Sequence, residues 1–228
     1  GQQIENLLGY YAWPAADISD FTKFPIPFMC LGTDLITGKK VEFKSGYLPD
    51  AIRASIAVPT IFTPVKIDTA LLVDGGVVRN FAPAEARQMG ADIVIGSYVG
   101  FHRYSEDELQ TMTGILKQVG FLTSMFDYQN QKKYADLVIE PKVKGFPSTV
   151  FSNVDSLYNR GYVAASAYRD YFRRLADSLN SFGPPRPREH ILDKEYYAFD
   201  KIFITGNHII SDSRIMGILE LRPGQFTD

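Results

Sequence analysis

The chain has 228 residues, 45% of them hydrophobic and 22% charged, a composition typical of a globular protein large enough for a substantial buried core. The formal net charge is −2, and no run of basic residues offers a surface for nucleic acid or anionic lipid. No segment approaches the roughly 20 apolar residues that span a bilayer, and the single cysteine, Cys30, has no partner for an internal disulfide.

The first residues, GQQIENLLGYY, contain neither an initiator Met nor the basic and apolar regions of a secretory signal. We therefore expect the chain to be a piece of a longer protein. The next stretch, WPAADISDFTKFPIP, contains three prolines and predicts a loop.

Two strands, a short helix and a further strand are predicted before the chain passes Asp74. FMCLGTDLITGKKVEFKSG predicts two strands around the turn Thr37-Gly38-Lys39, which is a hairpin pattern. LPDAIRASIA predicts a short helix, with Asp50 near its start and Pro59 after its end. IFTPVKIDTALLVDGG predicts further strand that ends at Asp74.

After Asp74, helices and strands alternate. PAEARQMG predicts a short helix between Pro83 and Gly90, and ADIVIGSYVG predicts a strand buried on both faces, as in a parallel sheet. Ser105 and Glu108 are typical of a capping box that opens a long helix. The apolar residues of that helix fall largely on one side: Leu109, Met112, Leu116, Val119 and Phe126. ADLVIEPKV predicts another short buried strand.

The strongest periodic segment predicts one helix over residues 154–179. Its apolar stripe is expected to face the core and contains Tyr158, Tyr162, Ala165, Tyr168, Phe172, Leu175 and Leu179. The segment SFGPPRPREH is too rich in proline for a helix or a central strand and predicts a linker. Beyond it we expect one strand, a Gly-Asn turn and an amphipathic helix, too few elements for an independent core.

The decapeptide LLVDGGVVRN, residues 71–80, allows two interpretations of Asp74. Asp and Gly are common in tight hairpin turns, so Asp74 can be a simple turn residue. It can also be a catalytic acid, because active sites collect at strand ends in open α/β sheets. By itself the decapeptide does not separate the two.

Four blocks together resemble the second half of a patatin-like phospholipase domain. They are TDLITGKKVEF, AIRASIAVPTIFTPV, LLVDGGVVRNFAPAEARQMGAD and ADLVIEPKV, in that order, and the resemblance covers about residues 25–179. It implies a three-layer α/β/α sandwich and a lipid acyl hydrolase that uses a Ser–Asp dyad. Asp74 would then be the general base, supported by Gly75, Gly76, Asn80, Ser55 and Pro59.

The chain departs from this family in one important respect. A glycine-rich oxyanion loop and a Gly-x-Ser-x-Gly nucleophile motif are both absent, and GSYVG at residues 96–100 has its serine one place too early. Ser55 matches a family position, but not that of the nucleophile. We therefore expect an N-terminally truncated domain that holds the base, lacks the attacking serine and is inactive as it stands.

The last 30 or so residues resemble the beginning of a POTRA domain, which commonly precedes an outer-membrane β-barrel of the Omp85 or type V secretion kind. The resemblance implies a parent protein in the envelope of a Gram-negative bacterium, tethered to such a barrel. A terminal strand and helix that merely complete the first domain are the alternative. The expected organisation is a partial patatin-like domain over residues 1–182, a linker over 183–195 and the start of a POTRA-like domain over 196–228.

Three functional hypotheses remain open. The parent is a phospholipase A or lysophospholipase acting on phospholipid or another acyl ester; or the domain is an inactive scaffold for outer-membrane binding or assembly; or Asp74 is a turn residue of an unrelated binding domain. We expect no cofactor and no metal, since His102, His190 and His208 have no metal-ligand spacing. Because a truncated sheet would expose apolar surface, we also expect the chain to self-associate.

Overall fold

The computed structural model describes residues 2–59, 61–100, 105–143, 146, 153–184, 197–198, 200–206, 211–219, 222–224 and 226–227. The chain divides into two compact units, Gly1–Arg188 and Glu189–Asp228. His102, His190, His208 and most of the proline-rich stretch lie outside the described residues.

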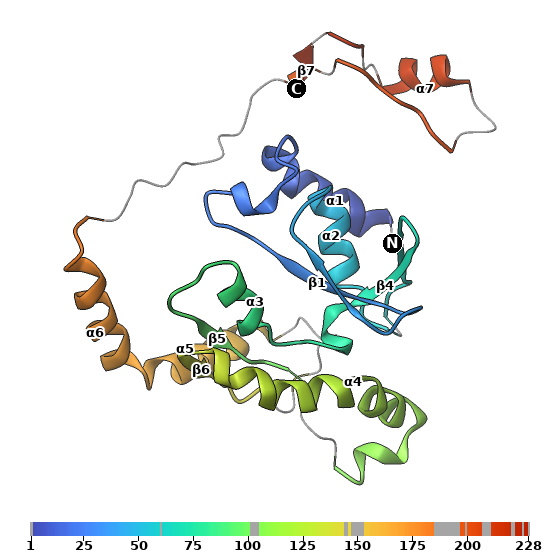
Figure 1. Ribbon diagram of the computed structural model, residues 1–228. Coiled ribbons are helices and arrows are strands. Elements are labelled where there is room, and N and C mark those ends of the chain that lie inside the picture. The colour runs from blue at the N-terminus through green and yellow to red at the C-terminus, as the bar shows by residue number, and fades with distance from the viewer. Residues whose placement is uncertain are drawn as a thin grey trace. The chain divides into compact units, whose positions relative to one another are not determined.

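The first unit contains a four-stranded sheet (Figure 1). Its strands are β1 (Cys30–Asp34), β2 (Lys40–Phe43), β3 (Val65–Ile67) and β4 (Ala70–Asp74), in the order β2-β1-β4-β3 with every neighbouring pair antiparallel. The predicted hairpin at Thr37-Gly38-Lys39 is confirmed. The Asp34 carboxylate accepts hydrogen bonds from the Ile36 N–H (3.1 Å) and the Thr37 hydroxyl (2.7 Å), which hold the turn closed.

Helices α1 (Gln2–Ala12) and α2 (Leu48–Ser55) contact each other, and α2 also contacts β1 and β4 (Figure 1). The helix α2 was predicted from the sequence, whereas α1 was not. Two single-turn 3-10 helices, η1 (Trp13–Ala15) and η2 (Phe21–Lys23), follow α1 in the stretch predicted as a loop. The residues buried most completely around this sheet are Phe21, Ala51, Ala54, Ala57, Leu72 and Val73.

The strand β4 leads through a 3-10 turn, η3 (Gly75–Val77), to α3 (Pro83–Gln88), which ends before Gly90 as predicted. A parallel pair of short strands follows, β5 (Ile95–Ser97) and β6 (Leu137–Ile139), which confirms the parallel pairing expected for ADIVIGSYVG. The fold of the first unit is therefore mixed α/β.

The long helix between these strands begins later than predicted. The segment Glu108–Gln110 is a 3-10 turn (η4), and the helix α4 covers Met112–Gln131, followed by a second turn, η5 (Lys132–Tyr134). The predicted capping box is wrong, because the Thr111 side chain caps α4 by accepting the Gly114 N–H at 3.0 Å.

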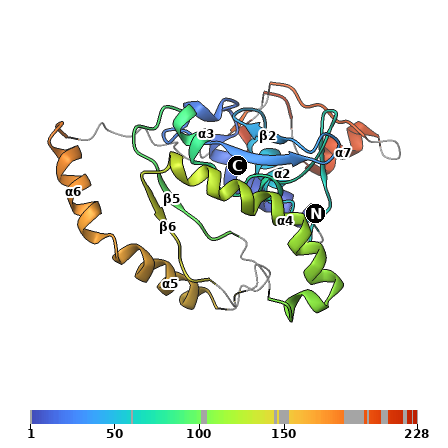
Figure 2. The same ribbon diagram turned by 60° about the horizontal axis from the view of Figure 1, so that its bottom comes forward.

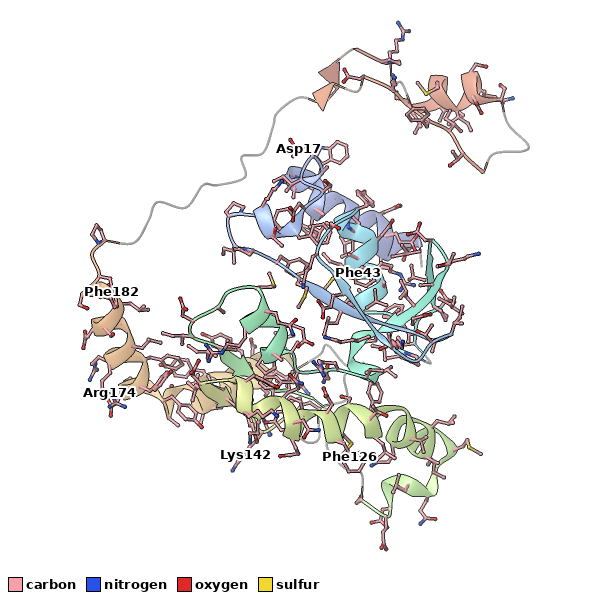
Figure 3. All side chains as sticks on the ribbon, viewed as in Figure 1. Asp17, Phe43, Phe126, Lys142, Arg174 and Phe182 are labelled. Atoms are coloured by element: carbon pink, nitrogen blue, oxygen red, sulfur yellow. The ribbon has the colours of Figure 1, made fainter. Side chains whose placement is uncertain are left out.

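The apolar side of α4 is exposed, and so is one face of β5, which was predicted to be buried on both faces. On α4, Met112 is 72% exposed and Phe126, labelled in Figure 3, is 62% exposed. On β5, Ile95 is 43% exposed, so this strand is not buried on both faces. The prediction for β5 was wrong because an apolar run does not show whether another element packs on each face, and no described element covers the exposed residues of β5.

The single helix predicted over residues 154–179 is two helices, α5 (Val154–Ser166) and α6 (Arg169–Asn180), which follow one another in Figure 2. The break falls at Tyr168, whose backbone (φ −106°, ψ 18°) has left the helical region. Neither helix contains a buried residue, and Tyr158 is 74% exposed. The core assignment of this aromatic stripe is therefore wrong as well.

The second unit is small. It contains β7 (Tyr197–Ala198) paired antiparallel with β8 (Phe226–Thr227), and the helix α7 (Asp212–Leu219), which was predicted. The stretch 201–205, expected as strand, is coil, and Gly206 of the expected Gly-Asn turn has a φ of 75°. Within the described part of the chain, no helix has the length and apolarity needed to cross a bilayer.

Candidate active site

Asp74 is the last residue of β4 and lies beside Gly32 of β1 in the sheet. Its main chain is held from both sides. The Asp74 N–H donates to the Ala57 carbonyl oxygen (3.0 Å), and the buried Thr33 hydroxyl donates to the Asp74 carbonyl oxygen (3.0 Å). Since both partners belong to other elements, the position of Asp74 is fixed by tertiary contacts as well as by the strand.

Both glycines after Asp74 lie close to other atoms: Gly75 to the main chain of β1, which excludes a larger residue, and Gly76 to the ends of the Asn80 and Asp74 side chains. A Cβ on Gly75 would lie 2.5 Å from the Leu31 carbonyl oxygen, and a Cβ on Gly76 would lie 2.9 Å from Asp74 Oδ1. Neither glycine has a positive φ. The turn therefore differs from the primed hairpin turns that Asp-Gly pairs commonly make, because here the chain continues into a 3-10 turn.

The carboxylate of Asp74 is half-buried, and its Oδ1 accepts the Gly76 N–H at 2.6 Å. Burial raises the pKa of Asp74 above its ordinary value, and the hydrogen bond from Gly76 offsets part of that shift. No ion pair to Asp74 occurs among the described residues. A carboxylate in this state is more basic than an exposed one, as proton abstraction requires.

Asn80 lies between the Asp74 turn and the end of the β5 segment. Its Oδ1 lies 2.8 Å from the position that a Cβ on Gly76 would occupy, and its Nδ2 lies 2.6 Å from the position that a Cβ on Gly100 would occupy. The Tyr98 ring also packs at Gly100, 2.5 Å from that place. The structure thus brings the residues after β5 back to Asn80 and the Asp74 turn, about 20 residues earlier in the sequence.

Ser55 and Pro59 lie on the other side of the Asp74 main chain. Ser55 ends α2, two residues before Ala57, and its hydroxyl acts on the Cys30 thiol, whose pKa it lowers by less than burial raises it. Burial raises the pKa of that thiol to about 11, so Cys30 is protonated at neutral pH and is no nucleophile. Pro59 is half-buried in the loop after Ala57.

Sequence reasoning missed several residues that hold this site. Thr33 and Ala57 fix the Asp74 main chain, and Arg79 links the turn to Glu85 and Asp127. These partners are up to 48 residues apart in sequence. Only Arg79 and Glu85 are close in sequence, and two opposite charges six residues apart do not by themselves predict an ion pair.

Other expected features lie elsewhere. Ser97 of the GSYVG segment is exposed on β5. A cavity of about 680 Å³ lies between β6 and α5, with Val138 and Ala164 on its apolar wall and Lys142 and Arg160 on its polar wall, and none of the Asp74 turn residues line it. Among the described residues, no group of three or more His, Cys, Asp or Glu side chains is arranged to hold a metal ion.

The family-model match of this chain includes the Asp74 turn of this site. Residues 18–87 match the family model of the patatin-like phospholipases. An uncharacterized NTE family protein of Mycobacterium tuberculosis is 34% identical over 119 residues, which cover 50% of this chain and 33% of that protein.

More distant similarity extends to fungal enzymes. The lysophospholipase nte1 of Emericella nidulans is 22% identical over 175 residues, covering 66% of this chain and 12% of its own length. The lysophospholipase NTE1 of Meyerozyma guilliermondii is 20% identical over 178 residues, covering 67% and 12%. The chain thus spans about a third or less of the length of these relatives. Together these comparisons support the patatin-like phospholipase family for this chain, and the residues that match the family model include Asp74 and its two glycines.

Proposed function

We propose that this chain supplies the general base, Asp74, of a patatin-like lipid acyl hydrolase of the phospholipase A or lysophospholipase type. The observation that carries the proposal is the half-buried carboxylate with a raised pKa, held at a strand end by Ala57, Thr33 and Gly76. The lysophospholipases among its relatives favour a phospholipid or another acyl ester as the substrate.

In this proposal the two oxygens of Asp74 have different tasks. Oδ1 accepts the Gly76 N–H, which fixes the side chain, and Oδ2 takes the proton of a serine hydroxyl. The serine oxygen bonds to the acyl carbon, the ester C–O bond breaks, and the proton passes from Asp74 to the leaving alcohol. Water then attacks the acyl-serine while Asp74 takes its proton, the bond between the acyl carbon and the serine oxygen breaks, the proton passes from Asp74 to the serine oxygen, and the fatty acid is released.

The serine and the oxyanion-hole donors are proposed to come from outside these 228 residues, because the chain contains no Gly-x-Ser-x-Gly motif. Its limited coverage of the relatives is compatible with this. The 228-residue chain alone is accordingly expected to release no fatty acid from a p-nitrophenyl ester.

The test uses a longer form of the protein that includes the preceding sequence. Asp74→Asn should lower the release of fatty acid from a p-nitrophenyl ester or a phospholipid by about 10²-fold or more, the usual contribution of a general base. Asp68→Asn is the matched control, because it makes the same chemical change six residues away, at a residue that is exposed in the turn before β4. Full activity in a folded Asp74→Asn variant would contradict the proposal.

A catalytically inactive scaffold for outer-membrane binding or assembly is the second candidate. It is favoured by the sequence of these 228 residues, which contains no Gly-x-Ser-x-Gly motif and has Ser97 of the GSYVG segment one place away from the nucleophile position. The two candidates differ in a simple observable: the longer protein contains a Gly-x-Ser-x-Gly motif in the first case and none in the second.

We also propose that the second unit is the beginning of a POTRA-like domain and that the parent protein is attached to an outer-membrane barrel in a Gram-negative envelope. The sequence resemblance of residues 196–228 supports this, and α7 lies where the first helix of such a domain is expected. Fractionation of cells that produce the longer protein tests it, since the protein should be recovered with the outer membrane.

The exposed apolar faces support a third proposal, that the isolated chain self-associates. Leu116 and Val119 on α4 are 54% and 61% exposed, beside Met112 and Phe126. Burying such a face in a second copy removes apolar area from water. Light scattering should show a species larger than the 25.6 kDa monomer, and a clean monomer at micromolar concentration would contradict this proposal.

A further inference from the structure

A buried carboxylate lies beside the Asp74 turn and takes no part in the proposed chemistry. Glu85 of α3 has a completely buried side chain. Its Oε1 accepts hydrogen bonds from Lys40 Nζ of β2 and from Arg79 Nη1, whereas its Oε2 has no partner among the described residues. A buried carboxylate is stable only when it is paired, so these two cations are required at this place.

Arg79 connects this carboxylate to α4. Its Nε donates to Asp127 Oδ2 at 2.9 Å and its Nη2 donates to Asp127 Oδ1 at 3.1 Å, a bidentate contact. All three guanidinium nitrogens are therefore engaged, two with α4 and one with α3. Lysine has a single nitrogen and could not make the same set of contacts.

The main chain of Arg79 closes the turn that begins at Asp74. The Arg79 N–H donates to the Gly75 carbonyl oxygen at 2.8 Å. The residue that ends the turn is thus the residue whose side chain is fastened to α3 and α4. Any freedom of the Arg79 side chain would pass directly to the glycines that orient the Asp74 carboxylate.

The charged residues around Glu85 affect Asp74 through geometry and not through net charge. Lys40, Lys44 and Arg79 are balanced by Glu42, Glu85 and Asp127, all joined by ion pairs. The other elements that contact β4 and η3 also carry titratable groups, namely Cys30, Asp34, Asp50, Arg53, Lys66 and Tyr128. None of these forms an ion pair with Asp74 in the described part of the chain.

We infer that Arg79 is a positioning residue for Asp74: by fastening the turn over residues 75–79 to α3 and α4, it keeps the Asp74 carboxylate half-buried with Oδ1 on the Gly76 N–H. Its importance for catalysis rests on the proposed function. The positioning itself does not, and it is measurable in the 228-residue chain.

The variants separate loss of the Arg79 contacts to α3 and α4 from loss of an arginine ion pair that does not involve the turn. Arg79→Gln removes the three contacts, and Asp127→Asn is the milder change, because it keeps the shape of the partner and the Arg79–Glu85 pair. Arg87→Gln is the control. Arg87 also makes one ion pair, with Asp136 (2.5 Å), and donates to the Tyr134 carbonyl oxygen (3.1 Å), but it joins α3 to the β6 segment and not to the turn.

Two measurements by NMR report on the turn: hydrogen exchange of the Gly76 N–H, and titration of the Asp74 carboxyl carbon. We expect Arg79→Gln to lower the protection of the Gly76 N–H about tenfold or more beyond the loss seen in Arg87→Gln, as local opening of the turn requires. The pKa of Asp74 should fall toward its ordinary value as water reaches the carboxylate. Asp127→Asn should change both in the same direction by less.

The inference is overturned if Arg79→Gln and Asp127→Asn leave the Gly76 protection and the Asp74 pKa at their values in Arg87→Gln. It is also overturned if Arg87→Gln changes them as much as Arg79→Gln does. In the longer, active form the acid limb of the pH–rate profile should move to lower pH in Arg79→Gln. If Asp74→Asn retains full activity, the proposed function fails, while the exchange result still decides whether Arg79 positions the turn.

Discussion

The substitution Gly75→Ala tests the close packing on which the Asp74 turn depends. The new Cβ would lie 2.5 Å from the Leu31 carbonyl oxygen and 2.7 Å from the Leu31 carbonyl carbon, whereas Cβ atoms are essentially never found closer than 3.0 Å to such atoms. Because both are main-chain atoms of β1, no flexible side chain can move aside. The turn and β1 must separate by about half an ångström.

That separation acts on the contacts that hold Asp74. The pairing of Gly32 with Asp74 and the 3.0 Å hydrogen bond from the Thr33 hydroxyl to the Asp74 carbonyl oxygen both cross the same junction. Overpacking costs about 1–3 kcal/mol, and a weakened buried hydrogen bond adds about 1 kcal/mol. We therefore expect a loss of about 3 kcal/mol, which for a unit of this size lowers Tm by roughly 6–12 °C.

Thermal and urea denaturation followed by circular dichroism measure this loss. Gly120→Ala is the matched control, because a Cβ on Gly120 of α4 meets nothing within 4 Å and the helix gains about 0.5–1 kcal/mol from the better helix former. A Gly75→Ala protein as stable as the original chain would refute the reasoning. So would equal losses in the two variants, since the reasoning predicts opposite signs.

Three further predictions concern the same sheet. Thr33→Val, a change of nearly equal volume, should cost about 1–3 kcal/mol in urea denaturation, because it leaves the Asp74 carbonyl oxygen without its hydroxyl donor. Hydrogen bonds from Lys40 and Lys44 lower the pKa of Glu42 to about 2, so the ionised Glu42 stabilises the fold above the pKa it has in the unfolded chain, and this stabilisation is lost as pH falls toward 2. Glu42→Gln should therefore flatten the decline of Tm between about pH 4 and pH 2. An unchanged slope would contradict the lowered pKa of Glu42. For Asp74 the pH dependence of stability has the opposite sign: its pKa is raised in the folded chain, which therefore binds the proton more tightly than the unfolded chain, and stability falls as pH rises. Asp74→Asn should therefore raise Tm at pH 7 and lose this advantage below about pH 4. A lower Tm of the variant at pH 7 would show instead that the ionised carboxylate stabilises the turn.

Several local features could be predicted from the sequence because they depend on neighbouring residues. Pro83 and Gly90 delimit α3, and the Thr37-Gly38-Lys39 turn joins β1 to β2, as expected from backbone preferences that act over a few residues. The Asp-Gly-Gly block was also recognisable as the end of a strand, and Asp74 is the last residue of β4.

Burial was decided by the tertiary structure. The periodic stripe of α5 and α6 was expected to be core, yet Tyr158 and Leu179 are more than half exposed. A helical period identifies the residues of one face, but it does not reveal whether another element packs there. The same limit applies to the break at Tyr168, because a long apolar pattern is equally compatible with one helix or two.

The sequence by itself determined which residue ends β4 and that two glycines follow it, because turn chemistry is local. Only the tertiary structure decided why those glycines are needed and what holds the acid. Gly75 packs on the main chain of β1, more than 40 residues earlier, and Arg79 reaches Asp127, 48 residues later. Such contacts arise when distant segments meet in the folded chain, and a pattern of neighbouring residues carries no record of which segments will meet.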